Sequence, residues 1–251
     1  MGREWTVFLK LQTWIFLGGG LLVTLQIAAA AVLLSLVTGT LMGLARLSKL
    51  PLVHHPAALY IDVIRGIPVF LIIIFTFFGL GRLNIETSVA GSVTIALTIY
   101  ATALIAEVVR AGILAVPPGQ IEAARGLGLS RVQTFRYVTF PQAFRMMIPA
   151  LAGQYIMLIK STSIGAVIGL DEVLRRAIIL YNGYQNPLQS LFVAAGIYFL
   201  LLSTLSRLSR RLELPDRALT AVPVGEDSLL SRLRPARLLS RGGATTLPKT
   251  N

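Results

Sequence analysis

The stretch GQIEAARGLGLSRVQTFRYVTFP, residues 119–141, interrupts a chain otherwise rich in long apolar runs. Pro117 and Pro118 precede it, and proline both removes a backbone donor and disfavours helix in the residue before it. The following QIEAARGL is a run of good helix formers that ends near Gly128, where a glycine commonly takes the left-handed conformation that stops a helix. The first half of the stretch therefore predicts a short helix ending in a glycine turn.

The second half of the stretch predicts another short helix. Ser130, with Gln133 three residues later, fits a capping box that opens a helix. Val132, Phe135 and Val138 then step along one helical face. Pro141 is expected to close this helix. Residues 114–141, called the elbow below, are thus predicted to form a helix, a glycine turn and a helix.

The composition places the elbow in a membrane protein. Of 251 residues, 55% are hydrophobic and 14% charged, whereas a soluble domain carries about a quarter charged residues. There is no cysteine, which excludes disulfides, thiol catalysis and zinc–thiolate sites. The chain is therefore expected to be a polytopic all-α membrane protein.

Apolar stretches long enough to cross a bilayer recur along the chain. A hydrocarbon core of about 30 Å needs roughly 20 mainly apolar residues per helix. The glycine run at residues 18–20 is expected to separate an interfacial helix from the first span, and Pro51 and Pro56 to mark a turn that holds both histidines. The amphipathic residues 171–187 are expected at the membrane surface. We expect five spans, near residues 20–45, 58–80, 87–113, 146–170 and 188–205.

The basic residues indicate the orientation and the domain limits. Lys and Arg number 23 against 11 Asp and Glu, and most lie in loops on one side of the spans or after the last span. Cytoplasmic loops carry such an excess, so we expect the N-terminus outside and the elbow and C-terminus in the cytoplasm, with no nucleic acid partner. We expect an N-terminal periplasmic or interfacial segment at residues 1–19, a transmembrane domain at 20–210 and a basic, disordered tail at 211–251.

Two interpretations of the elbow compete at this stage. A basic amphipathic helix after a span often lies on anionic lipid. Glu122 would be repelled by such a surface, and a glycine turn would serve no purpose in a helix lying flat. Both features suit docking into a groove of a protein, where a carboxylate can meet an arginine or backbone donors.

The elbow resembles the EAA loop of ABC importer permeases. The residues that match that loop are Glu122, Ala123, Ala124, Gly128, Val138, Phe140 and Pro141. Four stretches are similar to the polar amino acid uptake branch of this family: YIDVIRGIPVF (60–70), AEVVRAGILAVPPGQIEAARGLGLS (106–130), FPQAFRMMIPAL (140–151) and LIKSTSIGAVIG (158–169). The resemblance covers about residues 15–210.

The resemblance implies a fold, a function and a set of partners. The fold would be the five-helix core of a type I importer permease, paired with an identical or paralogous permease in the inner membrane of a bacterium. The elbow would be the coupling helix seated on a separate ATPase subunit that binds ATP and Mg²⁺, and an extracytoplasmic binding protein would deliver an amino acid. This chain would itself need no cofactor and would not be an enzyme. It contains no G-x-x-x-x-G-K-[ST] sequence, so it cannot cradle a nucleotide by the P-loop route.

The elbow and its docking face supply the candidate coupling residues. The resemblance provides the EAA positions, and the helical spacing adds two apolar side chains. The candidates are Glu122, Ala123, Ala124, Gly128, Val132, Phe135 and Pro141.

Ionisable residues inside spans are costly and suggest function by default. Asp62 with Arg65, and Glu107 with Arg110, lie three residues apart and are expected to pair on one helical face as structural anchors. Lys160 lies near the middle of the fourth expected span. It either pairs with one of the two acids or lines the translocation path, where its ammonium and the neighbouring hydroxyls would contact an amino acid's carboxylate. The substrate-path candidates are Lys160, Ser161, Thr162, Ser163, Glu107 and Asp62.

The residue after Lys160 bears on the cargo. Members of the family usually have an acidic residue there, and this chain has Ser161. A basic substrate is therefore disfavoured relative to an acidic or neutral amino acid.

Two other classes of protein are weighed against an importer subunit. A self-contained secondary transporter of small polar solutes would show an internal inverted repeat and usually more spans, and the sequence shows neither. An intramembrane hydrolase would need a nucleophile and a base within its spans, whereas His54 and His55 are expected outside them.

Overall fold

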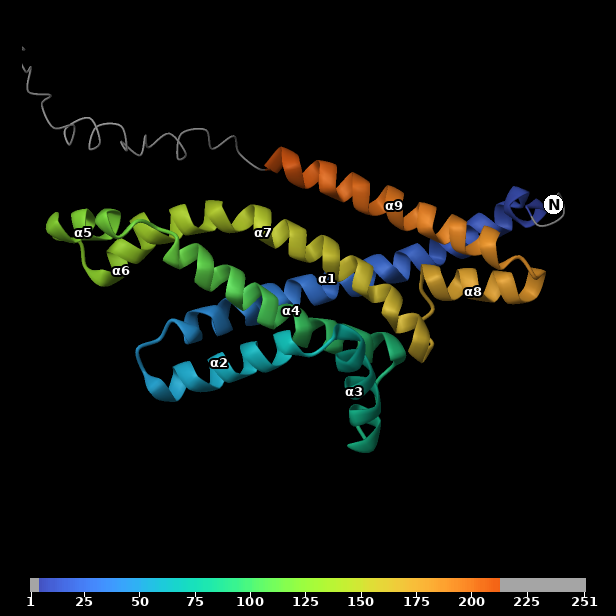
Figure 1. Cartoon of the computed structure of the whole chain (residues 1–251), viewed down its shortest axis with the longest axis horizontal. Coiled ribbons are helices and arrows are strands. Elements are labelled where there is room, and N and C mark those ends of the chain that lie inside the picture. The colour runs from blue at the N-terminus through green and yellow to red at the C-terminus, as the bar shows by residue number, and fades with distance from the viewer. Residues whose placement is uncertain (1–4, 213–251) are drawn as a thin grey trace, which may run out of the picture. The chain divides into compact units, whose positions relative to one another are not determined.

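The computed structural model describes residues 5–212, and within them all regular structure is helical (Figure 1). The tail expected at 211–251 therefore lies almost wholly outside the described residues. The elements are the 3₁₀ turn η1 (Thr6–Leu9), α1 (Leu11–Arg46), α2 (Pro51–Gly66), α3 (Val69–Arg82), α4 (Val89–Leu114), α5 (Pro118–Gly126), α6 (Arg131–Thr134), the π turn η2 (Phe135–Thr139), α7 (Phe140–Ser161), the 3₁₀ segment η3 (Thr162–Ile168), α8 (Val173–Tyr184) and α9 (Pro187–Leu212).

Four helical stretches of the described chain are long and apolar enough to cross a membrane. They are α1, α4, the continuous stretch Arg131–Ile168 and α9. The pair α2 and α3 passes the same test together but is bent by 109°, and would supply a fifth span if the bent pair crosses as one. The helical membrane fold predicted from the sequence is confirmed.

The prediction that the glycine run breaks the first helix is wrong. Residues 18–20 lie inside the uninterrupted α1, and two of the three glycines make room for an arginine of α8. A Cβ on Gly19 or Gly20 would overlap the Arg176 side chain. Arg176 donates to the carbonyl of Phe16 (2.5 Å) and binds Asp171 (2.7 Å). The small residues thus let α8 dock on α1.

A second seam of small residues brings α1 against α4. Gly39 and Gly43 are buried and form a G-x-x-x-G pattern, which lets helices in a membrane approach closely. A Cβ on Gly39 would lie 2.7 Å from Cβ of Ile105, and one on Gly43 would lie 2.6 Å from the carbonyl oxygen of Ala106. The Thr38 and Thr102 hydroxyls hydrogen-bond across the same seam (2.5 Å). Helices α1 and α4 therefore form the tightly packed centre of the bundle.

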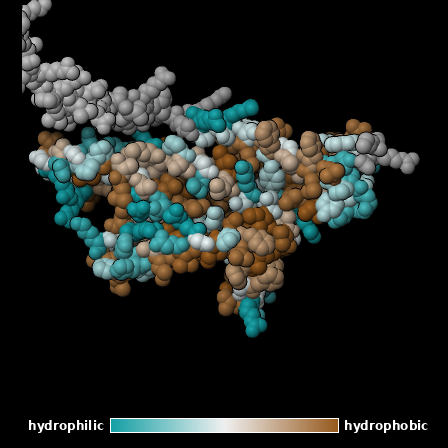
Figure 2. All heavy atoms as spheres, in the orientation of Figure 1, coloured by the Kyte–Doolittle hydropathy of each residue, from teal (hydrophilic) through white to brown (hydrophobic). Residues whose placement is uncertain are grey.

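The second expected span is not one straight helix. The chain leaves the helical conformation at Ile67 (φ −96°, ψ 130°), the residue before Pro68, because a proline disfavours helix in the residue that precedes it. The expected turn at residues 51–56 is also wrong, since Pro51 begins α2 and Pro56 lies within it. Both histidines are consequently helical. Figure 2 shows apolar side chains over the projecting α3, with hydrophilic atoms at its free end.

Helices α8 and α9 are tied together by a buried carboxylate that the sequence analysis did not single out. Glu172 is fully buried and caps α8 by accepting from the backbone N–H of Leu174 (2.9 Å) and of Arg175 (2.8 Å). It also accepts from the Tyr198 hydroxyl of α9 (2.5 Å). Burial raises the pKa of Glu172, and these hydrogen bonds partly offset the rise.

Candidate coupling elbow and transport path

The first half of the elbow folds as predicted, and the structure gives the reason. Helix α5 ends in a Schellman motif: the N–H of Gly128 donates to the carbonyl of Arg125 (2.9 Å), and the N–H of Leu129 donates to that of Ala124 (3.2 Å). Gly128 has φ +85°, which a residue with a Cβ adopts only at a cost. The Glu-Ala-Ala segment therefore sits directly on the turn, with Ala124 buried and with Glu122 and Ala123 exposed.

The capping box of the second helix is confirmed. The N–H of Ser130 donates to Oε1 of Gln133 (2.8 Å), and the N–H of Gln133 donates to Oγ of Ser130 (3.3 Å). The prediction that Pro141 closes this helix is wrong. Pro141 lies in the first turn of α7, where its missing N–H is tolerated. The chain passes from α6 through the π turn η2 into α7 without leaving the helical region, so the elbow is continuous with a candidate span.

The apolar residues of the second helix divide between two surroundings. Val132 is 74% exposed, and Leu127, at the turn, is 82% exposed. Phe135 instead packs on Phe140, with ring centroids 6.1 Å apart, and Phe140 stacks on Phe144 at 5.9 Å. Of the predicted docking face, Val132 points most fully away from the bundle. Phe135 lines an apolar cavity of about 280 Å³ against α1 and α4.

The base of the elbow is anchored in the bundle. Val116, between α4 and α5, is buried with Ile105 and Val109 of α4 and Met147 of α7, and Ile121 of α5 packs against this cluster. A close-packed interior transmits displacement because it has few voids. The base of the elbow therefore packs on both α4 and α7.

The predicted ion pairs are formed only in part. Glu107 binds Arg110 as expected (2.5 Å). Asp62 does not pair with Arg65: it binds Arg46 at the end of α1 (2.9 Å), which also reaches Glu107 (3.3 Å). Arg65 lies 4.0 Å from Glu107. The network thus joins three helices, α1, α2 and α4, which spacing along one helix could not reveal.

Lys160 pairs with neither predicted acid, since Asp62 and Glu107 are bound by arginines. It lies exposed in the last turn of α7 rather than in the middle of a regular helix. The hydroxyls that follow donate to nearby carbonyls: Ser161 to Met157 (3.1 Å), Thr162 to Ile159 (2.8 Å) and Ser163 to Lys160 (2.7 Å). Ser161 and Thr162 are buried and Ser163 is half-buried, so Lys160 is the most exposed of the four residues.

The substrate-path candidates therefore fall into two groups. Asp62 and Glu107 belong to the arginine network, and beside it a cavity of about 360 Å³ between α4 and α7 is lined by Arg65, Glu107 and Gln154 among apolar residues. Oε1 of Gln154 is buried and has no hydrogen-bond partner among the described residues. Lys160 belongs to a separate groove between α7 and α9. Gln154 could not be singled out from the sequence, because an isolated glutamine carries no spacing signal.

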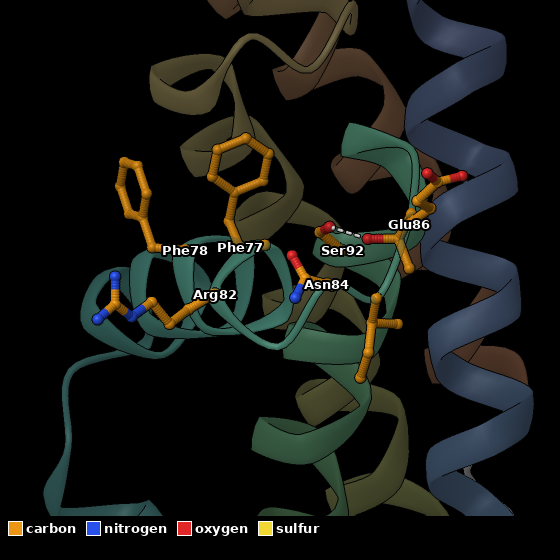
Figure 3. A pocket seen from close by; sticks show the side chains of 9 residues that line it. Phe77, Phe78, Arg82, Asn84, Glu86 and Ser92 are labelled. Atoms are coloured by element: carbon orange, nitrogen blue, oxygen red, sulfur yellow. Dashed lines mark hydrogen bonds between the residues drawn. The ribbon is translucent and has the colours of Figure 1, made fainter.

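A further hollow of about 670 Å³ lies at the turn between α3 and α4. Figure 3 shows the rings of Phe77 and Phe78 on one side of it and Glu86 on the other, with Asn84 between them. The Thr87 and Ser92 hydroxyls hydrogen-bond at its base (2.8 Å). None of these residues was a sequence candidate, and no ion pair within the hollow is found in the described part of the chain.

Comparison with known proteins agrees with the resemblance seen in the sequence. The profile of the family described as binding-protein-dependent transport system inner membrane component matches residues 35–215. A probable glutamine ABC transporter permease of Bacillus subtilis is 39% identical over 202 residues, covering 79% of this chain and 92% of that protein. A glutamate transport system permease of Corynebacterium glutamicum is 38% identical over 220 residues, covering 86% of this chain and 81% of that protein.

Solved structures support the same fold. A crystal structure of an amino acid ABC transporter with histidines contains a chain 33% identical to this one, with a TM-score of 0.77 over 80% of this chain and 94% of that chain. A methionine ABC transporter in an inward-facing conformation matches with a TM-score of 0.65 at 20% identity, which shows likeness of fold alone.

Proposed function

Because the chain belongs to the family of binding-protein-dependent transport system inner membrane components, we propose that it is the permease subunit of a bacterial ABC importer for amino acids. A separate ATPase subunit binds ATP and Mg²⁺ and hydrolyses the nucleotide. An extracytoplasmic binding protein delivers the amino acid, and a second permease, identical or paralogous, completes the pathway. The N-terminus lies outside and the elbow in the cytoplasm.

The observation that carries this proposal is the construction of the elbow. Helix α5 is joined to the start of the long helical stretch Arg131–Ile168 by the Gly128 turn and the Ser130 capping box, and this junction leaves Leu127, Val132 and Glu122 exposed. Exposed apolar side chains on a rigid turn suit docking on a protein. The carboxylate of Glu122 can meet a basic group of the ATPase.

The mechanism follows from how the elbow is anchored. When the ATPase subunits close on ATP, the docked elbow moves with them. Its base packs against Ile105, Val109 and Met147, so the motion passes into α4 and α7. These helices rock against their neighbours, and the site that faced outward opens inward. This is rigid-body alternating access, in which the ATPase supplies the work.

The relatives support amino acids as the class of cargo. Curated relatives are named for glutamine and glutamate, and others for nopaline and arginine. Their names therefore disagree on the charge of the cargo.

Cysteine cross-linking tests the proposed docking, and the chain lends itself to it because it has no native cysteine. In membranes that contain the whole transporter, Val132→Cys is expected to form a cross-link with the ATPase subunit. The matched control is Leu83→Cys, whose side chain is similarly exposed (69%, against 74% for Val132) but lies at the turn after α3. It should not cross-link to the ATPase. A cross-link from Leu83→Cys and none from Val132→Cys would contradict the proposal.

The same pair of variants tests the orientation. A membrane-impermeant maleimide added to intact cells, with the outer membrane permeabilised where there is one, should label Leu83→Cys and spare Val132→Cys until the inner membrane is opened. In addition, Glu122→Arg should lose the ATPase on co-purification while the permease keeps its melting temperature. Retention of the ATPase by that variant would show that Glu122 does not take part in docking.

A further inference from the structure

A groove of about 690 Å³ runs between α7 and α9 and is called the cationic groove below. Helix α7 contributes two residues and α9 the others. Its lining residues are Ile156, Lys160, Ala195, Tyr198, Phe199, Leu202, Ser203, Ser206, Arg207 and Arg210. The volume lies within the range of about 300–1,000 Å³ that holds small ligands in proteins.

The residues of α9 that line the groove change from apolar to polar and basic along the helix. Residues at helical spacing, three or four apart, face the groove, and the apolar ones come first: Ala195, Phe199 and Leu202. Ser203 and Ser206 follow, and then the two arginines. The groove therefore has an apolar wall at one end and hydroxyl and guanidinium groups at the other. Lys160 adds an ammonium from α7.

The positive charge in the groove is not balanced by the residues around it. None of its lining residues, all within the described chain, carries a carboxylate. Lys160, Arg207 and Arg210 form no ion pair among residues 5–212. The carboxylate behind the wall, Glu172, is fully buried and is engaged by the Tyr198 hydroxyl and two backbone amides.

Three cations that have no ion-pair partner among residues 5–212, gathered in one concave site, favour an anionic ligand. A cleft lined by one sign of charge with apolar walls focuses the field and raises the local concentration of the opposite charge. A basic amino acid would be repelled, and a neutral one would bring a single carboxylate to three cations. An acidic amino acid brings two carboxylates, and its ammonium can donate to the serine hydroxyls.

We infer that the cationic groove between α7 and α9 binds the carboxylates of an acidic amino acid on its way through the permease. This inference rests on the proposed function and narrows it to one class of cargo. Lys160, Arg207 and Arg210 hold the carboxylates, and Ser203 and Ser206 accept from the ammonium. A phosphate-bearing lipid is the competing anion, and the experiment separates the two.

The test compares L-glutamate with L-glutamine, two amino acids of nearly the same shape that differ in one charge. The full-length permease is placed in nanodiscs of phosphatidylcholine, and equilibrium binding of each radiolabelled amino acid is measured. A hydrogen bond to a charged group stabilises by about 1.4 kcal/mol more than a neutral one. Since 1.4 kcal/mol is a factor of ten, glutamate should bind roughly tenfold more tightly, and the difference should shrink as salt rises.

Charge removal in the groove should reduce this preference. Lys160→Gln is expected to weaken glutamate binding about tenfold and to change glutamine binding little. The matched control is Lys49→Gln, an exposed lysine in the turn between α1 and α2, which should leave both affinities unchanged. Arg210→Gln, at the exposed end of α9, gives the same test if Lys160→Gln does not fold.

Several results would overturn the inference. The first is that glutamate fails to bind, and the second is that it binds with the same affinity as glutamine. The third is that Lys160→Gln lowers the affinity for glutamate and the affinity for glutamine by the same factor. Displacement of glutamate by phosphatidylglycerol in the nanodisc, with no preference over glutamine, would assign the groove to lipid. Failure of the proposed function looks different, because then no amino acid enters cells that contain the whole transporter and no ATPase co-purifies.

Discussion

Replacing Gly128 by alanine tests the backbone conformation of the elbow without altering the side chains that would dock on the ATPase. Gly128 has φ +85°, and a Cβ built there meets no atom within 4 Å. The change therefore creates no clash and acts through the backbone alone. A left-handed conformation costs an L-residue about 1–2 kcal/mol. Because 1.4 kcal/mol is a factor of ten, the equilibrium constant that favours the folded elbow should fall about 5- to 30-fold, and the affinity for the ATPase should fall by up to that factor.

The matched control is Gly126→Ala, two residues earlier. Gly126 also has open space around its Cβ position, but it lies in α5 with ordinary helical geometry. Alanine is favoured over glycine in a helix by about 1 kcal/mol, so this variant should bind the ATPase as well as the wild type or better. Affinity is measured by biolayer interferometry with the permease in nanodiscs and the purified ATPase subunit in solution. Equal affinity in the two variants would refute the argument that the left-handed turn sets the docking geometry.

Three further predictions concern packing, charge and the docking face. Gly43→Ala should lower the free energy of unfolding by about 1–3 kcal/mol, because its Cβ would meet the Ala106 carbonyl. The control Gly18→Ala, with open space around its Cβ, should leave the free energy of unfolding unchanged. Thermal melting in detergent compares the two variants. Glu107→Gln should cost about 1.5–3 kcal/mol by weakening the bonds to Arg46 and Arg110; an unchanged melting temperature would show that the network is not a structural anchor. Val132→Asp should keep the wild-type melting temperature, because the side chain is 74% exposed, yet it should abolish co-purification of the ATPase; retained ATPase would remove Val132 from the docking face.

The elbow could be predicted in detail because its signals are local. The Gly128 turn and the Ser130 capping box each depend on residues within five positions of one another, and both are confirmed. Four of the five expected spans were also predictable, since hydrophobic length reports directly on the bilayer, whereas the second is a pair of helices bent by 109°. The prediction that Pro141 closes the second helix was wrong because the sequence alone does not distinguish a proline in the first turn of a helix from a proline just after a helix.

Features that depend on contacts between helices could not be predicted. The glycines at 18–20 look like a helix break, and only the docking of Arg176 shows that they make space. Asp62 has an arginine at the right spacing on its own helix, but its partner, Arg46, comes from α1. The groove around Lys160 likewise needs α9, more than thirty residues away along the chain.

Uptake into proteoliposomes tests most directly the claim that a separate ATPase drives this chain through the elbow. Vesicles are prepared with the permease alone and with its ATPase subunit, its binding protein and any sister permease, each with ATP on the ATPase side. Amino acids should accumulate only in the complete vesicles with ATP, and this accumulation should be lost when Val132→Asp replaces the wild-type permease. Accumulation by the permease alone would contradict the proposed role of the ATPase, because the chain would then be a self-contained transporter.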